Sequence, residues 1–443
     1  MGLLRGIDYS DPPVLYRGER ILALVRKLAA TATEMPEILD TEFAASVYYA
    51  LFLPAPILES PQPQGEPRKR MLQHLLLSSL LASPRFAKIR QHTIADLTAS
   101  TVASAVFLEA LLQELEHKLP RPDAGGASAR EGAPESQEAN TKEDDDELKR
   151  SVEKALDAAL DAARQAKEIS RFAMSFSAGS ASILTLEDSI QDVVSLARNT
   201  DVKTLLEALK TIEDTETYIK RRIMRSSRGE LDGYEKGSDL ERLVPSELVL
   251  PTEYFLVKYA ERSLLLYRKV VRQDYGPFYV LLDKSGSMMG MKMIWAKAVA
   301  LALAQRAARE RREFFLRFFD SIPYPPLHIS KRIHGRDVVK LLEYVARVRA
   351  NGGTDISRAI LTAVEDIASV RSGKKPSDIV LITDGEDKIS VELIRRSLAK
   401  VDARLYTIMI YGNNPDLRRV SESYMVATKL SREEALKVVM IGS

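Results

Sequence analysis

The stretch LLDKSGSMMG, residues 281–290, places an aspartate and two serines directly after an apolar run. The residues before it, GPFYVL (276–281), combine a turn signal with continuous apolar residues, which predicts a buried strand. Residues 291–310 have the pattern of a helix. Ligands of α/β folds bind outside the carboxyl ends of parallel strands. This polar turn is therefore a candidate phosphate loop, nucleophile site or metal site.

Strand and helix patterns alternate from residue 273 to the end of the chain. We expect strands at the short apolar runs Phe278–Leu282, Phe314–Phe319, Ile379–Thr383, Leu405–Tyr411 and Met425–Thr428. We expect helices at Met291–Arg312, Asp337–Arg349, Ile356–Ser369, Val391–Lys400 and Arg432–Val439. The alternation predicts a mostly parallel, doubly wound (Rossmann-like) α/β domain over residues 273–443.

The earlier part of the chain has other patterns. Residues 1–120 carry apolar residues at helical spacing and predict an N-terminal helical region. Residues 121–147 are rich in Gly, Ala, Pro and Ser and end in EDDDE, which predicts a flexible acidic linker, a solvated spacer rather than a site for a basic partner. Residues 148–272 predict a second helical region leading into the α/β domain. Its last helix is expected from Tyr254 to Val271. The first half is thus expected to be all-α.

Composition narrows the possible partners and the compartment. The 64 basic and 62 acidic residues give a net charge of +2, so there is no electrostatic case for nucleic acid or an anionic membrane as partner. The absence of cysteine excludes thiolate metal sites and cysteine nucleophiles. The N-terminus lacks the pattern of a signal peptide. The most apolar run, Phe43–Leu58, contains two prolines and is too short to span a bilayer. We expect a cytoplasmic protein with no membrane span.

Several kinds of chemistry do not fit the polar turn. The phosphate-binding patterns GxxxxGK[ST] and GxGxxG do not occur. Neither Ser285 nor Ser287 has the two flanking glycines of a hydrolase nucleophile elbow. An aspartyl-phosphate site would carry a second acid two residues after Asp283, where Ser285 stands. The five histidines neither pair with a serine nor show the i, i+4 spacing of zinc ligands; they are His74, His92, His117, His328 and His334.

A metal site built of oxygen ligands remains. Asp283, Ser285 and Ser287 form D-x-S-x-S after the first strand. Thr354 lies in NGGTDI (351–356) before a predicted helix, and Asp384 lies in LITDGE (381–386) at the end of a predicted strand. Mg²⁺ takes about six oxygens and keeps some of its waters. Two carboxylates and three hydroxyls would fill most of that shell and leave a position open.

The three loops together resemble the metal-ion-dependent adhesion site (MIDAS) of von Willebrand factor A (VWA) domains. All five liganding positions of that motif are present and in the expected order, and the resemblance covers Tyr275 to the C-terminus. It implies that Asp283, Ser285, Ser287, Thr354 and Asp384 hold Mg²⁺ or Mn²⁺. The alternative is that these are ordinary turn residues. We favour the metal site, because turns alone have no reason to repeat this combination.

Two further segments are similar to the intracellular CoxE/ViaA-type proteins: MKMIWAKAVALALAQRA (291–307) and GYEKGSDLERLVPSEL (233–248). That resemblance implies a helical region ahead of a C-terminal VWA domain, and a role as adaptor or co-chaperone of a MoxR-type AAA+ ATPase. The helical half would then be the surface for the ATPase. Lys284 departs from the pattern, since many relatives have a small residue there. It would either lower metal affinity or point to solvent.

These observations predict a non-enzymatic, metal-dependent protein-binding adaptor. Asp283 and Asp384 would balance the charge of the ion, and the helix beginning near Met291 would favour an anion nearby. A Glu or Asp of a partner would complete the shell. Glu386 and Asp387 are interpreted as solvated turn acids. The competing hypotheses are a metal-assisted phosphatase or hydrolase that uses Asp283, and a structural scaffold whose metal site is unused.

Overall fold

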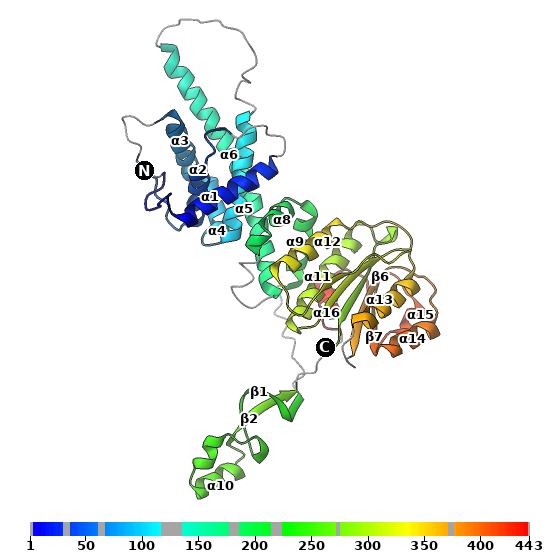
Figure 1. Ribbon diagram of the computed structural model, residues 1–443. Coiled ribbons are helices and arrows are strands. Elements are labelled where there is room, and N and C mark those ends of the chain that lie inside the picture. The colour runs from blue at the N-terminus through cyan, green and yellow to red at the C-terminus, as the bar shows by residue number, and fades with distance from the viewer. Residues whose placement is uncertain are drawn as a thin grey trace. The chain divides into compact units, whose positions relative to one another are not determined.

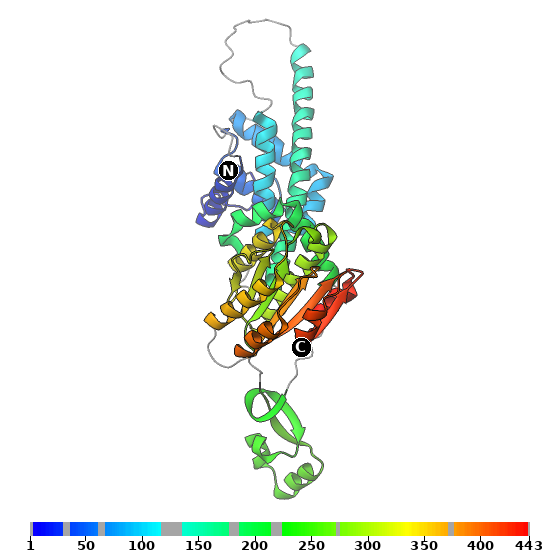
Figure 2. The same ribbon diagram turned by 90° about the vertical axis from the view of Figure 1, so that its right-hand side faces the viewer.

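The computed structural model describes residues 3–29, 36–60, 67–116, 135–176, 186–213, 224–271, 275–370 and 376–441. Internal contacts divide the chain into two compact units. The first comprises Met1–Glu207 and Arg332–Val348, and the second comprises Ala208–Lys331 and Arg349–Ser443. Helices dominate the first unit, whereas the second contains a twisted sheet with helices on both faces (Figures 1 and 2).

Helices account for most of the described residues up to 213, which confirms the helical prediction for the N-terminal region. They are α1 (Pro12–Leu28), α2 (Thr41–Phe52), α3 (Arg68–Ala82), α4 (Pro84–Thr93), α5 (Leu97–Glu116), α6 (Glu135–Phe176), α8 (Ile190–Ala197) and α9 (Thr200–Glu213). Helix α5 contacts α1, α2, α4 and α6. Its consecutive residues Val106, Phe107 and Leu108 are at most 2% exposed, as expected of a helix that is surrounded on all sides. Among the described residues, no helix is long and apolar enough to cross a membrane.

Helix α6 begins inside the segment predicted as a flexible linker. Residues 135–147 of that segment are helical, and residues 121–134 lie outside the described residues. The helix continues into a part that buries Val152, Leu156 and Ile169. A shortage of large apolar residues predicts the absence of a core, but it does not prevent Glu, Gln, Ala and Lys from extending a helix that is anchored further along.

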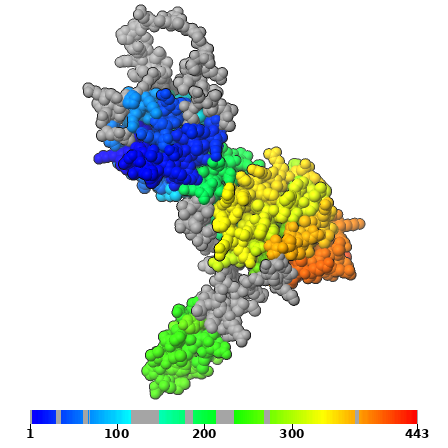
Figure 3. Space-filling view, viewed as in Figure 1, coloured from blue at the N-terminus to red at the C-terminus, as the bar shows by residue number. Residues whose placement is uncertain are grey.

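The segment 224–271 contains a β-hairpin where only helix and loop were expected. Strands β1 (Met224–Gly237) and β2 (Leu264–Val271) pair antiparallel, and α10 (Thr252–Ala260) lies between them in the chain. The predicted helix to Val271 is therefore wrong after Ala260, and the region ahead of the α/β domain is not all-α. A short segment such as LLLYRKVV fits a strand as well as a helix. Its pairing with β1 makes it a strand here. The surface of this segment, green in Figure 3, exposes Leu248, Val249, Tyr254 and Leu256.

The larger sheet of the second unit has six strands in the order β5-β4-β3-β6-β7-β8. Their bounds are β3 (Phe278–Asp283), β4 (Phe314–Phe319), β5 (Leu327–Ile329), β6 (Ser377–Thr383), β7 (Ala403–Ile410) and β8 (Ser423–Ala427). Strand β5 runs antiparallel to β4, and all other neighbours are parallel. Every residue of β3, β4 and β6 is buried, which explains their continuous apolar sequences. The predicted doubly wound α/β fold is confirmed.

Helices cover the sheet on both faces (Figure 1). Helix α11 (Met291–Arg309) packs against β3, β4 and the last helix, α16 (Arg432–Val439). On the other face, α13 (Ile356–Val370), α14 (Val391–Lys400) and α15 (Pro415–Val420) share an apolar core with alternate strand residues such as Tyr279 and Leu281. Helix α12 (Gly335–Arg347) follows β5 in the chain and packs against α6 and α8 in the first unit. Strand β5 and helix α15 were not predicted.

Candidate metal centre

The five predicted ligands come from three loops of the second unit. Asp283 is the last residue of β3, Asp384 directly follows β6, and Thr354 lies two residues before α13. Strands β3 and β6 are parallel neighbours with Leu282 opposite Ile382. Their carboxyl ends therefore meet at one edge of the sheet, and the first and third loops begin side by side.

Asp283 is fully buried at this edge. One carboxylate oxygen, Oδ1, accepts the Ser285 N–H at 2.8 Å, and the other accepts the hydroxyl of Thr383. Burial raises the pKa of Asp283 to about 6; the negative charge of Asp384 adds to the rise, and the hydrogen bonds from Thr383 and Ser285 oppose it. The carboxylate is thus oriented but short of positive charge. A divalent cation would supply that charge and favour the ionised form.

The serine hydroxyls and Asp384 form a row of oxygens. Ser285 Oγ lies 3.0 Å from Ser287 Oγ, and Ser287 Oγ donates to Asp384 Oδ1 at 2.7 Å. In an octahedral Mg²⁺ shell with bonds near 2.1 Å, neighbouring oxygens lie about 3 Å apart. The spacing of this row therefore fits the oxygens of one such shell, and the donor set is the oxygen-only set that Mg²⁺ and Mn²⁺ prefer.

Thr354 lies against the loop that carries Asp384. A Cβ placed on Gly385 would come within 2.9 Å of Thr354 Cγ2 and 3.2 Å of Thr383 Oγ1. The approach is this close because Gly385 has no side chain. All five predicted ligands therefore lie on three loops that contact one another.

The second loop is also bonded to the first. Asn351 N–H donates to the Lys284 carbonyl at 2.6 Å, and Gly286 N–H donates to the Gly352 carbonyl at 3.0 Å. Gly352 has a φ of +98°, a conformation that side chains rarely adopt. The glycine pair in NGGTDI thus serves a tight turn that holds Thr354 beside the D-x-S-x-S loop.

Lys284 does not point to solvent, so that interpretation is wrong. Its ammonium lies 2.8 Å from Asp320 Oδ2 and 4.4 Å from the centre of the Tyr324 ring, and it donates to the Asn351 carbonyl at 3.3 Å. Only 11% of its side chain is exposed. The charge of Lys284 is compensated by Asp320, so the lysine braces the first loop against the loop after β4 and the loop that precedes α13.

Three residues of the centre escaped the sequence analysis. Thr383 was part of a quoted motif but received no role, although it donates to Asp283. Asp320 follows β4 and binds Lys284. Lys292, the second residue of α11, places its ammonium 2.7 Å from Asp384 Oδ2 and 3.1 Å from the Ser287 carbonyl. Asp320 and Lys292 could have been found by looking for charged residues directly after the predicted strands and in the first turn of the helix that follows a strand.

The acids after Asp384 have different surroundings. Glu386 is exposed, as a solvated turn acid should be. Asp387 accepts the Ile356 N–H at 3.2 Å with its carboxylate and the Asn414 side chain at 2.8 Å with its carbonyl, so it ties α13 to the third loop. Within the described residues, no group of three or more His, Cys, Asp or Glu side chains is arranged to hold a metal. The predicted ligand set has only two carboxylates, and its other three members are hydroxyls, so it is not a group of that composition.

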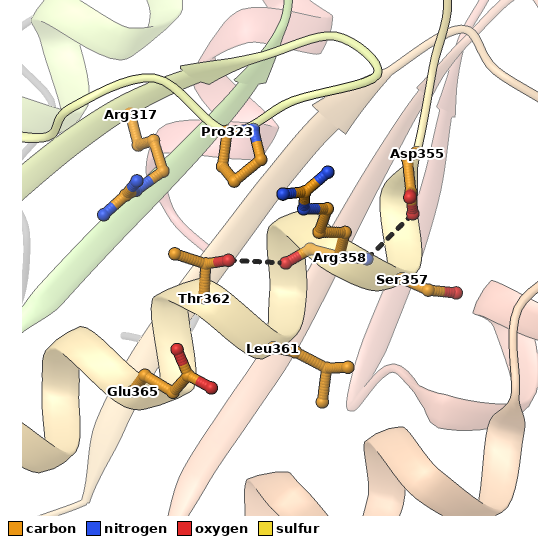
Figure 4. Close-up of a pocket in the computed structure, with 8 residues that line it drawn as sticks. All are labelled: Arg317, Pro323, Asp355, Ser357, Arg358, Leu361, Thr362 and Glu365. Atoms are coloured by element: carbon orange, nitrogen blue, oxygen red, sulfur yellow. Dashed lines mark hydrogen bonds between the residues drawn. The ribbon is translucent and has the colours of Figure 1, made fainter.

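A polar pocket lies next to the Thr354 loop, between α13 and the segment after β4 (Figure 4). It is lined by Arg317, Pro323, Asp355, Ser357, Arg358, Leu361, Thr362 and Glu365. Arg317 is buried and held by Tyr279 Oη at 2.7 Å and the Tyr324 carbonyl at 2.6 Å. Charged side chains of both signs and two hydroxyls line the pocket, which suits a polar protein segment better than an apolar small molecule.

Residues 256–430 match the family model described as VWA domain containing CoxE-like protein, and this segment contains all three loops. Two uncharacterised proteins of Methanocaldococcus jannaschii are similar to the chain. One is 26% identical over 294 residues, which cover 62% of this chain and 66% of that protein, just under two thirds of its length. The other is 24% identical over 376 residues, which cover 82% of this chain and 86% of that protein.

Solved structures also resemble part of the chain. A von Willebrand factor type A protein from Catenulispora acidiphila is 20% identical with a TM-score of 0.31, and the match covers 40% of this chain and 44% of that one. An aerotolerance-related membrane protein from Bacteroides fragilis is 15% identical with a TM-score of 0.30, covering 37% of this chain and 98% of that one.

Proposed function

Because the chain carries a VWA domain of the CoxE-like type, matched over residues 256–430, we propose that it is a non-enzymatic adaptor that binds a partner protein through a metal centre. The observation that supports this most is the row of oxygens from Ser285 through Ser287 to Asp384, beside the buried Asp283. Mg²⁺ or Mn²⁺ is the proposed ion.

The ligands of the proposed centre are Asp283, Ser285, Ser287, Thr354 and Asp384. When bound, the metal would act as a Lewis acid that accepts a carboxylate oxygen from outside. Thr383 and the Ser285 N–H fix the orientation of Asp283, and Lys284 holds the first loop against its neighbours. The side chains thus supply a prearranged shell, so the partner's Glu or Asp does not have to order the loops itself.

The geometry favours binding over catalysis. Asp283 is fully buried, and both of its oxygens accept hydrogen bonds. A nucleophile needs an accessible oxygen, whereas a ligand needs a fixed one. The polar pocket is lined by Asp355, the residue after Thr354, and offers hydrogen-bonding groups to the residues that flank the partner's acid.

The partner we propose is a MoxR-type AAA+ ATPase, by analogy with the proteins that the sequence resembles. Both halves of the chain would then take part: the VWA domain through the metal centre, and the helical region as a second surface. A cytoplasmic location belongs to the same proposal. The chain would act as an adaptor or co-chaperone of the ATPase.

The test is affinity capture of a MoxR-type ATPase by the full chain. Because the ATPase itself needs Mg²⁺, the metal centre is disabled by Ser287→Ala and Asp283→Ala rather than by a chelator. Glu386→Ala is the matched control, since it removes an exposed acid two residues from Asp384. We expect both centre variants to lose capture and metal binding in titration calorimetry, and the control to keep both. Equal capture by all four proteins would refute the metal bridge. Hydrolysis of p-nitrophenyl phosphate that disappears with Ser287→Ala would favour the enzyme hypothesis.

A further inference from the structure

Lys292 is held in the metal centre by three groups. Its ammonium lies 2.7 Å from Asp384 Oδ2, donates to the Ser287 carbonyl at 3.1 Å, and lies 5.5 Å from the centre of the Tyr411 ring. The Lys292 side chain is 27% exposed, and that of Asp384 only 4%. Lys292 is not one of the five proposed ligands, yet it contacts two of those residues directly, Asp384 through its carboxylate and Ser287 through its carbonyl.

The two oxygens of Asp384 have different partners. Oδ2 faces Lys292, and Oδ1 accepts the hydroxyl of Ser287 at 2.7 Å. Lys292 therefore binds one oxygen of the carboxylate, and Oδ1 remains beside the hydroxyls of Ser287 and Ser285. The two contacts on opposite sides fix the plane of the carboxylate. An ammonium on a mostly buried carboxylate also reduces its repulsion with Asp283.

Lys292 changes the charge of the centre. The two negative charges of Asp283 and Asp384 would offset the formal charge of a divalent ion, and Lys292 adds one positive charge. The loaded centre with Lys292 is therefore cationic, and it gains Coulomb energy from an anionic ligand but not from a neutral one. The same charge opposes the arrival of the metal, because the ion enters a centre that is already partly neutralised.

We propose that Lys292 is a positioning residue that fixes the Asp384 carboxylate and makes the metal-loaded centre select a carboxylate. This inference rests on the proposed metal-dependent binding and adds a residue that favours the acidic ligand. Lys292 is expected to lower the affinity of the centre for the metal and to raise the affinity of the loaded centre for a carboxylate. A residue with only a structural role would support both, so its loss would weaken both.

The test compares the full chain with Lys292→Met, which keeps side-chain length and contact with Tyr411 but removes the charge. Mn²⁺ binding is followed by water-proton relaxation at low ionic strength, and acetate is then titrated into the Mn²⁺-loaded protein. We expect Lys292→Met to bind Mn²⁺ about tenfold more tightly and acetate about tenfold more weakly. Both changes should shrink at high salt, because the charges are partly exposed.

Two controls separate this effect from general changes. Lys292→Arg keeps the charge and should restore wild-type behaviour for both ligands. Lys388→Met removes an exposed charge from the loop that carries Asp384 and should leave both affinities near those of the wild type. Circular dichroism of the metal-free proteins establishes that each variant is folded.

The outcomes are distinct. Tighter Mn²⁺ with weaker acetate supports the inference. Weaker or unchanged Mn²⁺ binding by Lys292→Met overturns it while the proposed function stands. If neither the wild type nor Lys292→Met binds Mn²⁺, the metal centre itself is refuted and this inference falls with it.

Discussion

The ammonium of Lys284 lies 2.8 Å from a carboxylate oxygen of Asp320, and the pair joins the loops that follow the neighbouring strands β3 and β4. Asp320 also accepts the Tyr324 hydroxyl at 2.9 Å and the Ile322 N–H at 2.8 Å. Although burial opposes it, the hydrogen bonds and the charge of Lys284 hold the pKa of Asp320 below its usual value. The pair belongs to the framework of the proposed metal centre rather than to its proposed ligands.

Breaking this pair should destabilise the metal-free protein. Each side chain is 11% exposed, so Lys284→Met and Asp320→Asn should each cost about 2 kcal/mol of unfolding free energy. The double variant should cost less than the sum, because the two changes remove the same interaction. Urea denaturation in EDTA measures all three.

The matched control is the ion pair of Glu392 and Arg396 on α14, whose side chains are 71% and 79% exposed. Its double-mutant cycle should give a coupling of about 0.3 kcal/mol. Equal coupling energies in the two cycles would show that the Lys284–Asp320 pair does not brace the loops.

A second prediction concerns Asp283, whose folded-state pKa of about 6 lies above its ordinary value of 3.8. Without metal, the folded protein binds a proton at Asp283 more tightly than the unfolded chain does. The stability from this group is therefore present below about pH 4 and is lost as the pH rises to about 6. The loss is at most about 3 kcal/mol.

Asp283→Asn removes this dependence, so in EDTA it should be more stable than the wild type by about 2 kcal/mol at pH 7 and not at pH 4. Other carboxyl groups titrate in both proteins, and taking the difference between the two unfolding free energies cancels them. A variant less stable than the wild type at pH 7 would mean that Asp283 has a compensating cation in the metal-free protein.

A third prediction concerns metal. If the centre binds Mg²⁺, an ion concentration a hundred times the dissociation constant should raise the unfolding free energy by about 2.7 kcal/mol. Ser287→Ala and Asp283→Asn should show little of this gain, because each loses a ligand. Thermal unfolding with and without Mg²⁺ measures it, with Ca²⁺ compared at the same ionic strength. A gain of equal size in all three proteins would indicate nonspecific ion effects.

The metal centre shows which features sequence patterns can predict. The strand, turn and helix around LLDKSGSMMG were predictable, because a polar cluster interrupts an otherwise buried apolar run. The five proposed ligands followed from a resemblance carried by three loops. Lys292 was not predictable in the same way, since its partner Asp384 is 92 residues away and only the packing of β3 beside β6 brings them together.

The hairpin segment shows the opposite case. Leu264–Val271 has no clear hydrophobic period, and a helix from Tyr254 to Val271 was predicted. In the structure, Tyr267 pairs with Tyr234 across the two strands, with ring centroids 5.8 Å apart. Such cross-strand contacts join distant parts of the chain, so no local pattern reports them.

The last prediction compares two glycines with positive φ, Gly352 at +98° and Gly290 at +81°. Alanine strains the backbone at both positions, at about 1 to 3 kcal/mol. A Cβ on Gly352 would also come within 2.9 Å of Asp320 Oδ2, whereas a Cβ on Gly290 has nothing within 4 Å. Gly352→Ala should therefore cost about 1 to 2 kcal/mol more than Gly290→Ala in urea denaturation.

Metal binding separates the two variants further. The Gly352 loop carries Thr354 and presses against Asp320, so a shift there moves a proposed ligand and the Lys284–Asp320 pair together. Gly352→Ala should weaken Mg²⁺ binding about tenfold or more, if one ligand is displaced. Gly290→Ala should change it little, because its Cβ meets no part of the centre. Equal losses of stability and of Mg²⁺ affinity in the two variants would show that backbone strain alone decides, and that the approach of Gly352 to Asp320 has no part in holding the site.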